Sequence, residues 1–156
     1  YASDAYQCFQ EANLTKLGEL LQTADLVIGY NIKQFDFQVL QPYLNFSLDT
    51  VPTLDILEEI EKIIGHRIKL DAVAQATLGA GKTGNGHNAI SLWRSGRLAE
   101  LKSYCLNDVK LTREIYEYAM ANGKLKFQDY FEVREIAINF PEPAARMNTT
   151  VQASLF

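Results

Sequence analysis

The chain has 156 residues, of which 47% are hydrophobic and 22% are charged, and its formal net charge is −4. This length predicts a single domain, and so apolar a composition excludes an intrinsically disordered segment. A net negative charge without any long run of lysine or arginine argues against a protein that coats nucleic acid by bulk electrostatics. This charge does not exclude an enzyme that binds a few phosphates locally.

The cysteines and the start of the chain bear on its origin. Cys8 and Cys105 form neither a disulfide framework nor a CxxC metal motif. With no signal peptide and no apolar run of membrane-spanning length, we expect a cytoplasmic protein in a reducing compartment. Because the chain begins at Tyr1 rather than Met and its first residues already resemble a structured element, we expect it to be N-terminally truncated.

Strands and helices are expected to alternate along most of the chain, which predicts the α/β class. The expected strands are residues 5–10, 26–30 and 50–54, and the expected helices are residues 13–22, 32–44, 56–65, 72–79, 88–94 and 98–121. The continuous apolar run at residues 26–30 has the length and composition of a buried parallel strand. Asn31 with Gln34 resembles a capping box, and we expect Asp55 and Asp71 to be N-caps.

The end of the chain has a different pattern. Residues 127–140 alternate polar and apolar side chains, which predicts a β-hairpin. Residues 141–156 have no period, and we expect them to form a loosely ordered tail. The predicted domain organisation is therefore one domain over residues 1–140 followed by a tail.

Two acidic residues fall in rows where helical spacing predicts apolar side chains. The first row contains Asp36, Leu40, Tyr43 and Leu44, and the second contains Leu98, Leu101, Cys105, Asp108, Thr112, Ile115 and Ala119. A carboxylate is costly to bury unless a cation or strong donors meet it. The simpler alternatives are a first-turn acid favoured by the helix dipole for Asp36, and a buried acid paired with arginine or a backbone cap for Asp108.

Two inward carboxylates on separate helices can share divalent cations. Carboxylate oxygens are hard ligands that suit Mg²⁺ or Mn²⁺. Two such ions roughly 4 Å apart stabilise the attacking and leaving oxygens during phosphodiester cleavage. Tyr104 lies one helical turn before Asp108, where it is placed to orient the attacking water or to contact the scissile phosphate.

Two segments resemble known nuclease motifs. GYNIKQFDFQVL, from Gly29 to Leu40, resembles the second motif of DEDD-type 3′→5′ exonucleases, Asn-x-x-x-Phe-Asp. YCLNDV, from Tyr104 to Val109, resembles their third motif in its tyrosine variant, Tyr-x-x-x-Asp, and Ser103 stands where the histidine variant would have histidine. The resemblance covers about residues 13–123 and is to exonuclease domains found alone or fused to helicases.

The resemblance implies an RNase H-like fold, with a mixed β-sheet flanked by α-helices. It also implies metal-dependent hydrolysis from the 3′ end of single-stranded DNA or RNA, with two Mg²⁺ or Mn²⁺ ions in the intact site. By position, Asp36 and Asp108 are metal ligands and Tyr104 orients the nucleophilic water.

Three further residues are candidates for substrate binding: Asn31, Phe35 and Lys82. The more ordinary interpretations are N-capping for Asn31 and a core position for Phe35. For Lys82, on a glycine-rich loop, the ordinary interpretation is a solvated turn. We expect Trp93 to be a core residue.

The chain departs from the family in one respect. The first family motif, Asp-x-Glu, does not occur in these 156 residues, and its place would be upstream of Tyr1. We therefore expect this chain alone to be inactive or nearly so, and the intact protein to be active. The alternative is a catalytically inactive nucleic-acid-binding or scaffold module, although Asp36, Tyr104 and Asp108 argue against loss of the chemistry. A P-loop is not expected, because Ala76 stands where that motif needs glycine.

Overall fold

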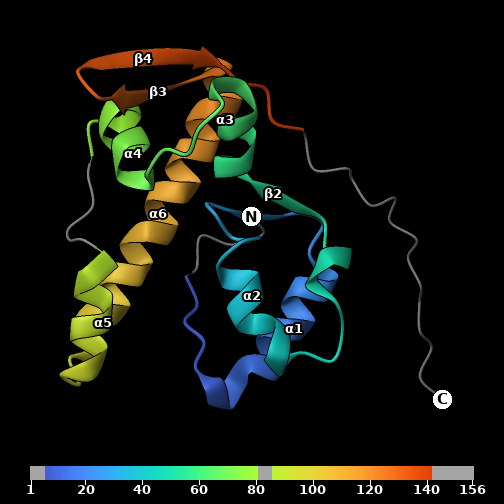
Figure 1. Cartoon of the computed structure of the whole chain (residues 1–156). Helices are drawn as coiled ribbons and strands as arrows, with labels where there is room; N and C mark the ends of the chain where they lie inside the picture. The colour runs from blue at the N-terminus through green and yellow to red at the C-terminus, as the bar shows by residue number, and fades with distance from the viewer. Residues whose placement is uncertain (1–5, 81–85, 142–156) are drawn as a thin grey trace.

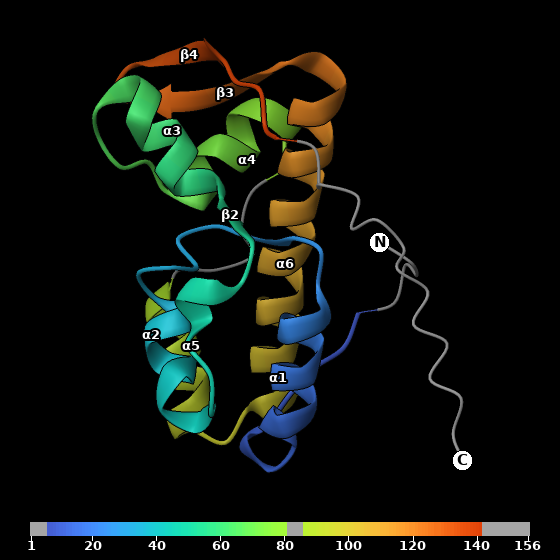
Figure 2. The same cartoon turned by 90° about the vertical axis from the view of Figure 1, so that its right-hand side faces the viewer.

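The computed structural model describes residues 6–80 and 86–141 of the chain (Figures 1 and 2). In chain order the elements are η1 (Glu11–Asn13), α1 (Leu14–Thr23), β1 (Val27–Gly29), α2 (Asp36–Leu40), η2 (Gln41–Tyr43), η3 (Leu48–Thr50), β2 (Thr53–Asp55), α3 (Ile56–Ile64), α4 (Leu70–Leu78), α5 (Gly86–Arg94), α6 (Leu98–Asn122), β3 (Lys124–Asp129) and β4 (Glu132–Ala137). Here η marks a short 3₁₀ turn. This mixture of helices and strands confirms the α/β class.

The strands form two separate pairs among the described residues. β1 pairs in parallel with β2, with Ile28 opposite Leu54, and β3 pairs antiparallel with β4. The expected single mixed sheet is therefore not found in this part of the chain. One reason is that Thr77 of α4 uses backbone hydrogen-bonding groups of β3 that another strand would need. Its hydroxyl donates to the Lys126 carbonyl at 2.7 Å and accepts from the Lys126 amide at 3.0 Å.

The two pairs lie at different levels of the molecule. Figure 1 shows the β3–β4 hairpin at the C-terminal end of α6, beside α3 and α4. Figure 2, turned by 90°, again places the hairpin at that end and α1 and α2 on the other side of β2. α5 packs against α6, toward the end remote from the hairpin.

β1 lies between two hydrophobic clusters. The larger cluster joins α3, α4, α6 and the hairpin, and its least exposed members include Ile60, Val73, Ile115 and Leu125, each 0% exposed. The smaller cluster is Leu21, Phe37, Leu48 and Val51. Alternate residues of the first strand face opposite sides, as strand geometry requires, so that Ile28 packs on the larger cluster and Val27 on the smaller. The prediction of a parallel strand is confirmed over Val27–Gly29, where Gly29 is buried and the other two residues are partly buried.

Several predicted boundaries are confirmed with small shifts. The helices expected at residues 13–22, 56–65, 88–94 and 98–121 form as α1, α3, α5 and α6, and the hairpin begins earlier than predicted, at Lys124. Gly123, with φ of 65°, ends α6 because a left-handed residue there costs glycine little. Asp55 caps α3 as predicted, but Asp71 does not cap α4, which begins at Leu70 with Lys69 as its N-cap.

Three other predictions of local structure are wrong. Residues 6–10 form no strand, and the second strand starts at Thr53 rather than residue 50. The helix expected at residues 32–44 is reduced to α2, followed by η2 with Pro42 near its start. Proline lacks the backbone N–H that would continue an α-helix. The loop before α2 makes hydrogen bonds that differ from those of an α-helix. Residues 142–156, most of the predicted tail, lie outside the described residues, as does Lys82.

Asp55 connects β2 to the loop that follows β1. It is 3% exposed and is the only charged residue among the buried side chains that the structure describes. Its carboxylate accepts hydrogen bonds from the backbone amides of Asn31 at 2.8 Å, Lys33 at 3.1 Å and Leu57 at 3.1 Å. Several amide donors satisfy a buried carboxylate, so this side chain fixes the loop on the end of the second strand.

We expect Asp55→Ala to lower the free energy of unfolding by about 3 kcal/mol, because the change leaves buried amides without an acceptor and removes a helix cap. Urea unfolding followed by circular dichroism measures this loss. The matched control is Asp49→Ala, an exposed acid of η3, for which the loss should stay below about 1 kcal/mol. Equal losses for the two variants would contradict this account of Asp55.

The larger cluster predicts a contrast between two phenylalanines of the hairpin. Phe127 is 1% exposed, whereas Phe131, at the hairpin turn, is 100% exposed. Phe127→Ala should lower the free energy of unfolding by about 3–5 kcal/mol, since it leaves a cavity in the core. Phe131→Ala should change it by no more than about 0.5 kcal/mol. A hairpin that folds independently of α4 and α6 would give similar small effects in both urea titrations.

Candidate functional site

The loop between β1 and α2 turns sharply at its start. A side-chain Cβ on Gly29 would lie 2.6 Å from the Cβ of Ile32, closer than real contacts allow. Asn31 has a φ of 62°, in the left-handed region that non-glycine residues seldom adopt. The loop is therefore tightly constrained directly after the strand, where ligands commonly bind in α/β sheets.

Arg67, which follows α3, holds the side chains of this loop. Its guanidinium donates to the side-chain oxygen of Asn31 and, at 3.1 Å, to the side-chain oxygen of Gln34. The same group pairs with Glu61 at 3.1 Å. The predicted capping box of Asn31 and Gln34 is therefore wrong, and Phe35 is the N-cap of α2, with no side-chain cap bond. No motif in the sequence pointed to Arg67.

Asp36 opens α2, and its side chain is exposed although its carboxyl is partly shielded from solvent. This partial burial raises the pKa of the carboxyl, a hydrogen bond with its own backbone lowers it, and the charge of Asp55 raises it further. The predicted inward row is wrong, because Phe37 is the buried residue of this helix and Tyr43 is 57% exposed. The change of helix type at η2 breaks the spacing on which that row depended.

Phe35 is 62% exposed, so its interpretation as a core residue is wrong. The exposed ring stands directly before Asp36, on the same loop. It is accessible to a base, which leaves its predicted role in substrate binding open to test.

Tyr104 and Asp108 lie on the N-terminal half of α6, and each is partly buried. The Oδ1 atom of Asp108 is shielded from solvent, and the Asp108 carbonyl accepts a 2.8 Å hydrogen bond from the Thr112 hydroxyl. The predicted apolar row holds only in the second half of the helix, where Ile115 is 0% exposed, since Leu98 is 49% exposed and Cys105 is exposed as well.

Cys105 reports on the electrostatics between α2 and α6. Burial raises the pKa of its thiol most, and the charges of Asp108, Cys8 and Asp36 raise it further. Asp36 and Asp108 come from different helices, and the charge of each raises the pKa of this thiol.

The described residues hold part of a metal site at most. Among residues 6–80 and 86–141, no group of three or more His, Cys, Asp or Glu side chains lies close enough to hold a metal ion. Asp36 and Asp108 can each offer carboxylate oxygens, which suit Mg²⁺ or Mn²⁺. Further ligands would have to come from water, substrate or residues beyond those described.

The basic residues near the loop are engaged in ion pairs. Lys33 contacts Glu58 at 2.6 Å, and Lys62 contacts Glu59 at 2.6 Å. The acids of α3 therefore pair with these cations. None of the described helices has both the length and the apolar composition needed to cross a bilayer.

The raised pKa of Asp36 predicts a pH-dependent effect on stability. Folding disfavours the ionised carboxyl, so no penalty exists well below pH 3.8, where both states are protonated. The penalty grows as the pH rises through 3.8 and through the raised pKa of the folded state. Asp36→Asn should therefore be more stable than the unchanged protein at neutral pH, and the difference should vanish in acid. Urea unfolding at several pH values tests this, and a pH-independent difference would contradict it.

Comparison with known families covers both halves of the candidate site. A model of the RNase H superfamily matches residues 4–120, a stretch that includes the loop with Asp36 and the helix positions of Tyr104 and Asp108. No curated protein and no solved structure matches the chain. The superfamily indicates a nuclease-like function in nucleic-acid processing, and its enzymes typically use divalent metal ions. Since the match spans most of the sequence, the chain belongs to the RNase H superfamily.

Proposed function

We propose that the protein is a metal-dependent 3′→5′ exonuclease of the tyrosine-type DEDD class, acting on single-stranded DNA or RNA. The observation that carries the proposal is the match to the RNase H superfamily over residues 4–120, which spans both the Asp36 segment and the segment of Tyr104 and Asp108. Membership of this superfamily provides the general chemistry. Besides burial, the charges of both acids raise the pKa of the Cys105 thiol, in keeping with acids that border one space.

In this proposal Asp36 and Asp108 hold divalent cations with their carboxylates. Partial burial of the Asp36 carboxyl, with a smaller effect of the Asp55 charge, disfavours negative charge at this position, and a bound cation would offset it. When bound, a pair of such ions stabilises charge on the attacking and leaving oxygens of a phosphodiester. The proposed ions are Mg²⁺ or Mn²⁺, in keeping with the oxygen ligands.

The other proposed roles belong to side chains around these acids. Tyr104 lies one turn before Asp108 on α6, and its hydroxyl would orient the attacking water. Phe35 would stack on the terminal base, and Lys82, outside the described residues, would contact a phosphate. Asn31 would act through the loop that Asp55 and Arg67 hold.

A second candidate function has one observation in its favour. The described residues contain no group of three potential metal ligands. A catalytically inactive RNase H-like module that binds nucleic acid or serves as a scaffold would need none. The two candidates differ in one measurable respect, which is whether bound strands become shorter.

The test uses the protein with its natural N-terminus, 5′-labelled single strands of DNA and RNA, and Mn²⁺. We expect a ladder of shortened products, and Asp108→Asn should lower its rate by at least about 100-fold, because one carboxylate ligand is lost. The matched control, Asp49→Asn, changes an exposed acid outside the site and should leave the rate unchanged.

Each outcome of this assay decides between the candidates. A ladder that persists at full rate in Asp108→Asn would refute the assigned site. Binding of labelled strands without any shortening would favour the inactive module. The relative rates on DNA and RNA would identify the substrate.

A further inference from the structure

One exposed face of α5 carries a large aromatic side chain and a cation. Ile90 is 58% exposed and Trp93 is 67% exposed, while Leu92, 8% exposed, occupies the inward position. Ile90, Trp93 and Arg94 are three and four residues apart, so they share one side of the helix. The interpretation of Trp93 as a core residue is therefore wrong, because Leu92 fills that place against α6.

Arg94 differs from the other described arginines in having no ion pair with a described residue. Each of the others has a carboxylate partner: Arg67 with Glu61, Arg97 with Glu100, Arg113 with Glu117 and Arg134 with Asp129. An exposed guanidinium with no carboxylate partner is available to an external anion. The charge on this face is thus complementary to a phosphate.

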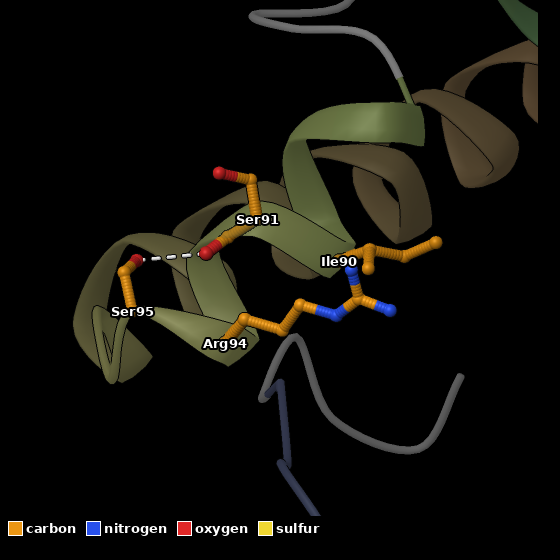
Figure 3. Close-up of a pocket in the computed structure, with 4 residues that line it drawn as sticks. All are labelled: Ile90, Ser91, Arg94 and Ser95. Atoms are coloured by element: carbon orange, nitrogen blue, oxygen red, sulfur yellow. Dashed lines mark hydrogen bonds between the residues drawn. The ribbon is translucent and has the colours of Figure 1, made fainter.

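A shallow depression on the surface of α5 includes Ile90 and Arg94 but not Trp93. It is lined by Ile90, Ser91, Arg94 and Ser95. Figure 3 shows the Arg94 side chain running back along the helix toward Ile90, while the Ser95 hydroxyl bonds the Ser91 carbonyl. The guanidinium therefore lies beside Ile90 and stays exposed to solvent.

We propose that this face of α5 binds single-stranded nucleic acid, with a base stacked on Trp93 and a backbone phosphate paired with Arg94. Single strands combine an aromatic face with regularly placed anions, and proteins bind them through exposed aromatic rings beside cations. The proposal rests on the proposed function, since it assigns a second contact to the same substrate strand.

The position of α5 suits a strand that continues to the candidate site. α5 packs against α6, near the end of α6 that is remote from the hairpin (Figure 1). From Leu98, at the start of α6, the helix rises about 15 Å to Asp108. α5 therefore packs beside the half of α6 that carries Tyr104 and Asp108, toward which a strand held at α5 would extend.

The single tryptophan of the chain gives a direct test. The full chain is titrated with an unlabelled 12-nucleotide thymidine or uridine strand in EDTA, where metal-dependent cleavage does not occur. Stacking of a base on Trp93 should quench most of the tryptophan emission at saturation. The same titration with a 5′-fluorescein-labelled strand gives affinity by anisotropy.

Matched variants separate this face from general charge effects. We expect Trp93→Ala to weaken binding by about tenfold, with partial recovery in Trp93→Phe. Arg94→Gln should weaken binding by about fivefold and reduce the salt dependence by about one phosphate contact. The controls are Phe131→Ala and Arg134→Gln on the distant hairpin, which remove an exposed ring and an equal charge, and they should leave affinity unchanged.

Other outcomes would overturn the inference without touching the proposed function. One is a strand that binds while tryptophan emission and the affinities of the Trp93 and Arg94 variants stay unchanged. Absence of any strand binding is another. Self-association that Trp93→Ala abolishes would show that the face covers a second copy of the chain. The exonuclease proposal is judged separately, by the metal-dependent ladder and its loss in Asp108→Asn.

Discussion

The candidate site depends on the hydrogen bonds that the carboxylate of Asp55 accepts. This carboxylate is buried at the end of β2, and it is stabilised by the amides of Asn31, Lys33 and Leu57. These bonds hold the loop after β1 in a path that includes a left-handed Asn31. Since α2 begins directly after that loop, the positions of Phe35 and Asp36 follow from where Asp55 holds the backbone. Arg67 adds a second constraint through the side chains of the loop.

The basic residues around this loop and the acid Asp36 have different electrostatic surroundings. Cations near it are neutralised by acids of α3, as in the pairs of Lys33 with Glu58 and Arg67 with Glu61. Asp36, by contrast, experiences the charge of Asp55, which helps to raise its pKa. A cation bound beside Asp36 would offset both the partial burial of this carboxyl and the charge of Asp55. This is the physical link between an RNase H superfamily chain and the metal-dependent function proposed for it.

Much of the fold followed from local pattern alone. The apolar run that forms β1, the Asp55 cap of α3, and the long helix ended by Gly123 are all set by spacing and by single residues at helix ends. Patterns were less informative where tertiary contacts compete with them. The helix predicted after Asn31 was shortened by the bonds of its loop to Asp55 and Arg67, partners 24 and 36 residues away. No periodicity within the segment could have shown these partners.

The sequence by itself determined the α/β class, the resemblance to nuclease motifs and the candidate acids Asp36 and Asp108, because motif spacing is a property of the chain. Only the tertiary structure decided that Phe35 and Trp93 face solvent and that Arg67 holds the loop. Exposure depends on which neighbours pack on a side chain. For Trp93, Leu92 took the inward place, a choice between adjacent apolar residues that only the packing of α5 on α6 could make.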